Sequence, residues 1–126
     1  MSDVRALTSH EREVLEFLLQ GEWDGSAALR SQLSTARFGG RWSADSASFD
    51  LVVDPSAPRA ELGEDAAAEC VVSGDSGLAE GELFLRVEDG VLVGLECSLF
   101  TDEAALPPVG KLLSHADFDA RGCTPF

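Results

Sequence analysis

The sequence predicts an α+β protein in which two N-terminal helices pack on one face of a four- or five-stranded antiparallel sheet, followed by an irregular C-terminal tail. Apolar residues recur at helical spacing up to residue 37, and from residue 38 onward they alternate with polar residues as they do in strands. We therefore expect a single domain over residues 1–126, with helices over about 8–37, the sheet over about 38–100 and the tail over 101–126.

The first helix is expected to begin at Thr8, because Thr8 and Glu11 form a capping-box pattern and Gly21 supplies a stop. Four apolar side chains follow on one helical face: Val14, Leu15, Leu18 and Leu19. A second helix is expected to start at Asp24-Gly25-Ser26 and to end near Arg37, with a narrower apolar stripe.

The strand pattern predicts strands over residues 37–42, 49–53 and 67–73, separated by turn residues and by a loop rich in Pro, Ala and acids over 55–65. In the 67–73 strand, Cys70 and Val72 share one face, while Glu69 and Val71 share the other. Beyond Phe100 the alternation decays, and we expect a tail laid across the domain.

Residues 82–100 predict a β-hairpin whose loop length follows from the strand register. A two-residue loop, Asp89-Gly90, would oppose Leu85 to Gly94 and mix apolar with charged residues on one face. A three-residue loop over 88–90, with a left-handed Gly90 in a bulge, opposes Leu85 to Val93 and keeps one face apolar. We therefore expect the longer loop, which leaves a half-polar second face: Glu82, Phe84, Arg86, Leu92, Gly94 and Glu96.

The charge of the chain restricts its partners. Nine Lys and Arg residues against 23 Asp and Glu residues give a formal charge of −14, of which residues 42–126 carry −13. Such a surface repels nucleic-acid phosphates and anionic membranes, whereas it attracts a basic protein. The acidity also has a simpler interpretation, because acidic surfaces favour solubility.

Catalytic, metal and cofactor motifs are not evident. Cys70, Cys97 and Cys123 have no CxxC spacing and are expected to be reduced thiols, while His10 and His115 are expected to be surface residues. Three acids that invite a metal site, Asp45, Asp50 and Asp54, lack the pattern of a calcium loop. We therefore expect a non-enzymatic protein that binds neither a cofactor nor a metal ion.

No apolar stretch reaches the length of a transmembrane helix, and the N-terminus lacks the pattern of a signal peptide, so we expect a cytoplasmic protein. Trp23 and Trp42 are typical of partly buried core residues, but both stand near the ends of elements, where aromatic residues also serve interfaces.

The candidate site is the exposed face of the sheet, as a binding site for a basic protein. Four acids are expected around an apolar centre: Asp50, Glu69, Glu82 and Glu96, around Phe84 and Leu92. An alternative is a ligand-binding domain or small enzyme with a pocket between the sheet and the 55–65 loop, where Arg41 and Arg86 hold an anion. Because two copies would bring like charges together, we expect a monomer.

Four sequence runs resemble a group of small actinobacterial proteins of unknown function: Leu7-Thr8-x-x-Glu11-x-x-Val14-Leu15, Leu29-Arg30-x-Gln32-Leu33, Phe49-Asp50-Leu51-Val52-Val53-Asp54, and Gly81-Glu82-Leu83-Phe84-Leu85-x-Val87-x-Asp89-Gly90-x-Leu92-x-x-Leu95-Glu96. The resemblance covers most of residues 7–103 and implies no activity. Members often carry Gly-Cys-Gly-Cys where this chain has Arg41-Trp42-Ser43-Ala44, so no role of those cysteines transfers. In general type, an acidic α+β domain without catalytic residues also resembles immunity proteins of bacterial toxin systems.

Overall fold

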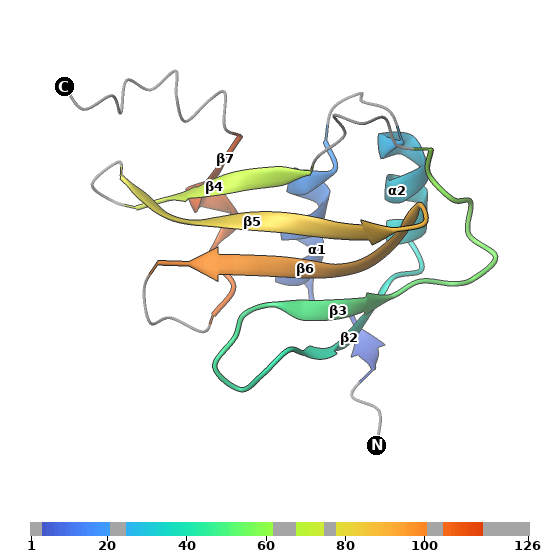
Figure 1. The fold of residues 1–126 in the computed structure, drawn as a ribbon, viewed down its shortest axis with the longest axis horizontal. Helices are drawn as coiled ribbons and strands as arrows, with labels where there is room; N and C mark the ends of the chain where they lie inside the picture. Colours follow the sequence, from blue (N-terminus) through green and yellow to red (C-terminus); the bar gives the residue numbers. More distant parts are fainter. Residues whose placement is uncertain (1–3, 21–24, 62–67, 75–77, 101–104, 115–126) are drawn as a thin grey trace.

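A computed structural model shows one antiparallel sheet with two helices on one side (Figure 1). The structure describes residues 4–20, 25–61, 68–74, 78–100 and 105–114. These residues form seven strands in the spatial order β1-β2-β3-β6-β5-β4-β7: β1 (Arg5–Ala6), β2 (Arg37–Arg41), β3 (Phe49–Val52), β4 (Glu69–Ser73), β5 (Ala79–Glu88), β6 (Val91–Leu99) and β7 (Leu112–Leu113). The helical elements are α1 (Ser9–Leu18), α2 (Ser26–Leu33) and the 3-10 turn η1 (Val109–Lys111).

The predicted α+β class is confirmed, but the strand count was too low. The five expected strands correspond to β2, β3, β4, β5 and β6, and the two missed strands, β1 and β7, form the outer strands of the sheet. Each of these has only two residues, which is too short for an alternating pattern to be recognised. Such short outer strands also leave little unpaired backbone for another chain to pair with.

The C-terminal segment lies across the domain as expected, but it is not irregular throughout. It passes on the helix side of the sheet, where Leu106 and Val109 pack against the core and Pro107 O lies 2.9 Å from His10 Nε2. These side chains cover part of this face beside the helices, and Leu112–Leu113 then pair with β4 as β7. The predicted behaviour of residues 115–126 lies outside the described residues.

Helix α1 begins as the capping box predicts. The Glu11 amide donates to Thr8 Oγ1 at 3.1 Å, and the Thr8 amide donates to Glu11 Oε1 at 2.9 Å. Helix α2 ends at Leu33, earlier than predicted, because the chain tightens there into turns, with the Thr35 and Ala36 amides bonding three residues back.

The predicted three-residue hairpin loop is wrong. Asp89 and Gly90 have φ values of 51° and 76°, which is typical of a two-residue type I′ turn. Glu88 opposes Val91 and Val87 opposes Leu92, but Arg86 then opposes Gly94, so Val93 is an extra residue in β6. This bulge restores the apolar face, since Leu85 opposes Leu95 and Leu83 opposes Cys97. The bulge was expected at Gly90 in the loop, whereas the structure has it at Val93 in β6.

A buried glutamine joins α2 to this hairpin. Gln32 is 0% exposed, and its Nε2 donates to Pro58 O at 2.7 Å and to Gly90 O at 2.8 Å. Its Oε1 accepts a hydrogen bond from the Leu92 amide at 2.9 Å. The Ala60 amide also donates to Gly90 O, so one amide side chain ties together the helix, the 58–60 segment and the hairpin turn.

Replacement of Gln32 by Leu is expected to destabilise the protein by about 2 kcal/mol or more, because it leaves the buried Leu92 amide without a hydrogen-bond partner. Urea unfolding measures the change, and Ser31→Ala, at an exposed position of the same helix, is the matched control. A Gln32→Leu variant as stable as the wild type would contradict this role.

Candidate functional site

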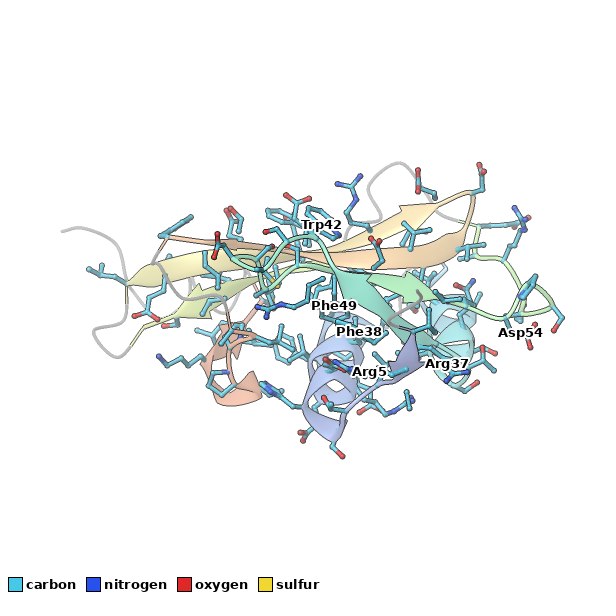
Figure 2. All side chains as sticks on the ribbon, turned by 90° about the horizontal axis from the view of Figure 1, so that it is seen from below. Arg5, Arg37, Phe38, Trp42, Phe49 and Asp54 are labelled. Carbon is cyan, nitrogen blue, oxygen red and sulfur yellow. The ribbon has the colours of Figure 1, made fainter. Side chains whose placement is uncertain are left out.

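The outer face of the sheet, defined here as the face opposite α1 and α2, carries most of the predicted site. Figure 2 shows Trp42 on this side, whereas Phe38 and Phe49 point to the helix side. Glu69 opposes Phe84 and Phe84 opposes Glu96, so an aromatic ring is flanked by two carboxylates in one row across β4, β5 and β6. In the next row, Asp50 and Arg86 oppose Gly94 from either side.

The structure places five of the six predicted residues on this face. Asp50 and Glu69 are exposed, and the other three are half-buried: Glu82, Phe84 and Glu96. Leu92 is a correction, because it is 1% exposed and belongs to the core on the helix side. The bulge at Val93 changes the alternation of β6, and this turns Leu92 inward towards Gln32.

Trp42 was not among the predicted site residues, although it is 47% exposed and well positioned on the outer face. Its Nε1 donates to Asp50 Oδ1 at 3.1 Å, and the Arg86 guanidinium lies 5.9 Å from its ring centroid. Arg86 in turn donates to Glu96 Oε1 at 3.0 Å. In the sequence, the position of Trp42 near the end of a predicted strand was the feature that indicated a possible interface residue.

Gly94 lies beside this cluster, where the backbone of β3 approaches β6 closely. A Cβ atom at this position would lie 2.9 Å from Phe49 O, closer than real Cβ contacts allow. Asp50 and Arg86 flank Gly94 across the sheet, and Trp42 contacts both of them. The indole therefore joins β3 to β5 across the one outer position of β6 that has no side chain.

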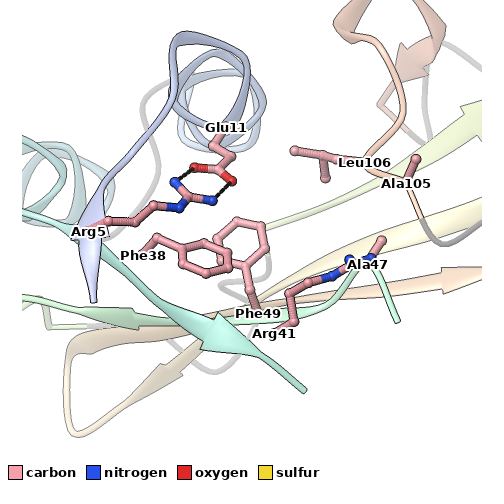
Figure 3. A pocket seen from close by; sticks show the side chains of 8 residues that line it. All are labelled: Arg5, Glu11, Phe38, Arg41, Ala47, Phe49, Ala105 and Leu106. Carbon is pink, nitrogen blue, oxygen red and sulfur yellow. Dashed lines mark hydrogen bonds and ion pairs between the residues drawn. The ribbon is translucent and has the colours of Figure 1, made fainter. Parts of the chain in front are cut away.

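A cavity of about 310 Å³ lies on the helix side of the sheet, near the β1 edge (Figure 3). Its lining comes from β1, α1, β2, the β2–β3 loop, β3 and the C-terminal segment: Arg5, Glu11, Phe38, Arg41, Ala47, Phe49, Ala105 and Leu106. Arg5 donates to both carboxylate oxygens of Glu11, at 2.9 and 2.8 Å, and its guanidinium lies 3.8 Å from the Phe38 ring centroid.

This cavity differs from the pocket considered from the sequence, which was expected beside the 55–65 loop. Arg41 lines the cavity, but Arg86 points to the outer face, so the structure does not bring these two arginines together. The described part of the loop is instead joined to the hairpin turn through Pro58 and Ala60.

Cys70, Cys97 and His10 are the cysteines and the histidine of the described residues, and each has a structural environment: the thiols are at least partly buried, and His10 contacts Pro107 O. Cys70 and Cys97 are free thiols, and burial raises the pKa of each to about 12, so thiolate is scarce near neutral pH. Among the described residues no group of three or more Cys, His, Asp or Glu side chains is arranged to hold a metal ion. Trp23, His115 and Cys123 lie outside the described residues.

In the described part of the chain, neither helix has the length and apolar character needed to cross a lipid bilayer. Comparison with known protein families, with characterised proteins and with solved structures gives no match to this chain.

The Arg5–Glu11 pair predicts a pH-dependent stability difference. Partial burial alone would raise the pKa of Glu11, but hydrogen bonds from Arg5 and Thr8 outweigh this effect and lower it below 4.5. The stabilisation is thus present above pH 4.5 and is lost as the pH falls through the lowered pKa. Glu11→Gln should lower the free energy of unfolding by about 1 kcal/mol at neutral pH and by less in acid.

Chemical unfolding of the wild type and Glu11→Gln across a pH series measures this deficit. Glu16→Gln, an exposed change on the same helix, is the control and should show no such trend. A deficit that stays constant from neutral pH to pH 3 would show that the charge of Glu11 does not act in this way.

Proposed function

We propose that this chain is a non-enzymatic, acidic protein-binding module that holds a basic partner on the outer face of its sheet. The observation that carries the proposal is the row formed by Glu69, Phe84 and Glu96. An apolar side chain between carboxylates is suited to an interface in which an aromatic anchor is buried and charged groups surround it.

The tryptophan cluster supports the same face. Trp42 is half exposed and is held by Asp50 and Arg86, so its ring is preorganised and loses little rotamer freedom on binding. Tryptophan is also among the residues enriched at binding hot spots. In the proposed site, Trp42 therefore serves as the second apolar anchor beside Phe84, in place of Leu92, which is buried.

The charge of the chain indicates the class of partner. A formal charge of −14 accelerates encounter with a basic protein and opposes encounter with an acidic one. Most concretely, we propose an immunity-like or antitoxin-like role, in which the carboxylates of the outer face cover the cationic nucleic-acid cleft of a toxin. The chain would inhibit such a toxin by occupying its substrate site.

The test captures a basic protein with the tagged chain from its native cells and titrates it by calorimetry; capture of no basic protein would count against the proposal. Glu69→Lys with Glu82→Lys should weaken binding at least tenfold, about 1.4 kcal/mol, and should slow association. The matched control, Glu13→Lys with Glu16→Lys, makes the same charge change on the exposed side of α1 and should bind nearly as well as the wild type.

Two outcomes would count against the proposal. Equal weakening by the sheet and helix variants would show attraction by net charge alone, without a defined face. Binding that is unchanged when Trp42→Ser and Phe84→Ser are combined would show that the outer face supplies no anchors.

The free chain is expected to be a monomer in dilute buffer, because repulsion between two copies of charge −14 extends about 30 Å at 0.01 M salt. Salt shortens this range to about 8 Å at physiological ionic strength, so any self-association through Trp42 and Phe84 should strengthen as salt is added. Light scattering across a salt series measures the effect. A dimer complete at the lowest salt, and broken by Phe84→Ala, would show that copies of the chain occupy the proposed partner face.

A further inference from the structure

We infer that Trp42 and Glu96 form a subsite for an arginine side chain of the partner, and that Arg86 occupies this subsite as an internal competitor in the free protein. The observation that carries the inference is the position of Arg86, whose guanidinium contacts both the Glu96 carboxylate and the Trp42 ring. The inference rests on the proposed function, because it names the chemistry by which the same face would recognise a basic partner.

Arg86 is a cation on the face that is proposed to hold a basic protein. Its Nη1 donates to Glu96 Oε1 at 3.0 Å, so a carboxylate of the proposed site already has a guanidinium against it. Arg86 opposes Gly94 and Glu96 opposes Phe84, which makes the ion pair diagonal across β5 and β6. A guanidinium of the partner that takes the same position must therefore displace the side chain of Arg86.

Displacement of Arg86 costs little. The side chains of Arg86 and Glu96 are 50% and 36% exposed, so water and salt screen their attraction. Ion pairs of this kind contribute little to stability, and the released Arg86 side chain remains in water. The same contact formed by a partner's arginine is covered by the interface, where the attraction between the charges is screened less.

The Trp42 ring has room for a closer cation than Arg86. The Arg86 guanidinium lies 5.9 Å from the ring centroid, which is at the outer limit of cation–π contacts, about 6 Å. Elsewhere in this protein, the Arg5 guanidinium stacks on Phe38 at 3.8 Å. Indole attracts a cation more strongly than a phenyl ring does, and Trp42 is 47% exposed. The outer face therefore carries a strong cation acceptor with only a distant cation against it.

The indole keeps its orientation when Arg86 leaves. Its Nε1 donates to Asp50 Oδ1 at 3.1 Å, and the Trp42 amide donates to Ser48 O at 3.0 Å. Neither hydrogen bond involves Arg86, and Figure 2 shows Trp42 on the side of the sheet away from the helices. A ring held in this way is a preorganised surface for an incoming group.

The geometry favours arginine over lysine. A planar guanidinium can stack on the indole while its N–H groups donate to the Glu96 carboxylate. The ammonium group of lysine is a compact, strongly hydrated charge and cannot satisfy both neighbours in the same way. The subsite therefore selects arginine among the basic side chains of a partner.

Titration with N-acetylarginine methylamide tests the subsite without any partner protein. Nuclear magnetic resonance follows the Trp42 Nε1–H signal, which is assigned by its loss in Trp42→Phe. In Arg86→Gln the probe should shift this signal saturably, with an affinity at least about threefold higher than in the wild type. Arg37→Gln removes the same charge from an exposed position at the other end of β2 and should match the wild type.

Two comparisons identify the groups that bind the probe. N-acetyllysine methylamide should bind Arg86→Gln at least about threefold more weakly than the arginine probe does. Adding Glu96→Gln to Arg86→Gln should weaken the arginine probe, whereas adding Glu13→Gln, on the exposed side of α1, should not. No saturable shift in Arg86→Gln, equal binding of the two probes, or equal effects of Arg86→Gln and Arg37→Gln would each overturn the subsite.

Titration with the captured basic protein separates this inference from the proposed function. Arg86→Gln should bind it at least about tenfold more tightly than Arg37→Gln, because both lose one positive charge but only the first removes the competing guanidinium. Equal affinities of these two variants, with weakening by Glu69→Lys and Glu82→Lys, would retain the proposed face and overturn the subsite. If no basic protein is captured, the proposed function fails, and the probe titration still decides whether Trp42 and Glu96 bind a guanidinium.

Discussion

The arrangement of the sheet depends on the hydrogen bonds made by the amide side chain of Gln32. It is buried, and all three of its hydrogen bonds go to backbone groups of segments remote in sequence. Burying an amide without hydrogen-bond partners destabilises the folded state. The helix, the 58–60 segment and the hairpin must therefore come together as a unit. Gly90 belongs to the same junction, since a Cβ atom there would collide with Ala60 O.

This junction determines which side chains of β6 face the core. With the Leu92 amide held by Gln32 and a two-residue turn at Asp89-Gly90, the strand must accommodate one extra residue before Leu95 can oppose Leu85. The bulge at Val93 provides it, so Leu92 enters the core while Glu96 remains on the outer face. The proposed partner site is thus a consequence of packing on the other side of the sheet.

The sequence was sufficient where the determinants of structure are local. The Thr8–Glu11 capping box and the alternation around Phe49 and Cys70 each depend on neighbouring residues, and the structure confirms them. The bulge at Val93 could not be predicted in this way, because Leu92 beside it is held by Gln32, which is 60 positions away in the sequence. A glutamine on a helix normally indicates an exposed position, and nothing local distinguished this one.

The candidate site, like the fold, was predicted in part from the sequence. Alternation placed Glu69, Glu82, Phe84 and Glu96 on one face, because period two is a property of each strand alone. Leu92 was misplaced by the unrecognised bulge, and Trp42 was missed because its contacts with Asp50 and Arg86 arise only when three strands are aligned. The Arg5–Glu11 cavity likewise needed β1, which is too short to predict.

The cross-strand register of the β5–β6 hairpin tests this account most directly, because it fixes both the core and the outer face. Nuclear Overhauser contacts between backbone protons of opposed residues measure it in solution. The account predicts contacts that place Leu85 opposite Leu95 and Phe84 opposite Glu96. Contacts that place Leu85 opposite Val93 would require the three-residue loop, return Leu92 to the outer face and separate Phe84 from Glu96, contradicting the proposed site.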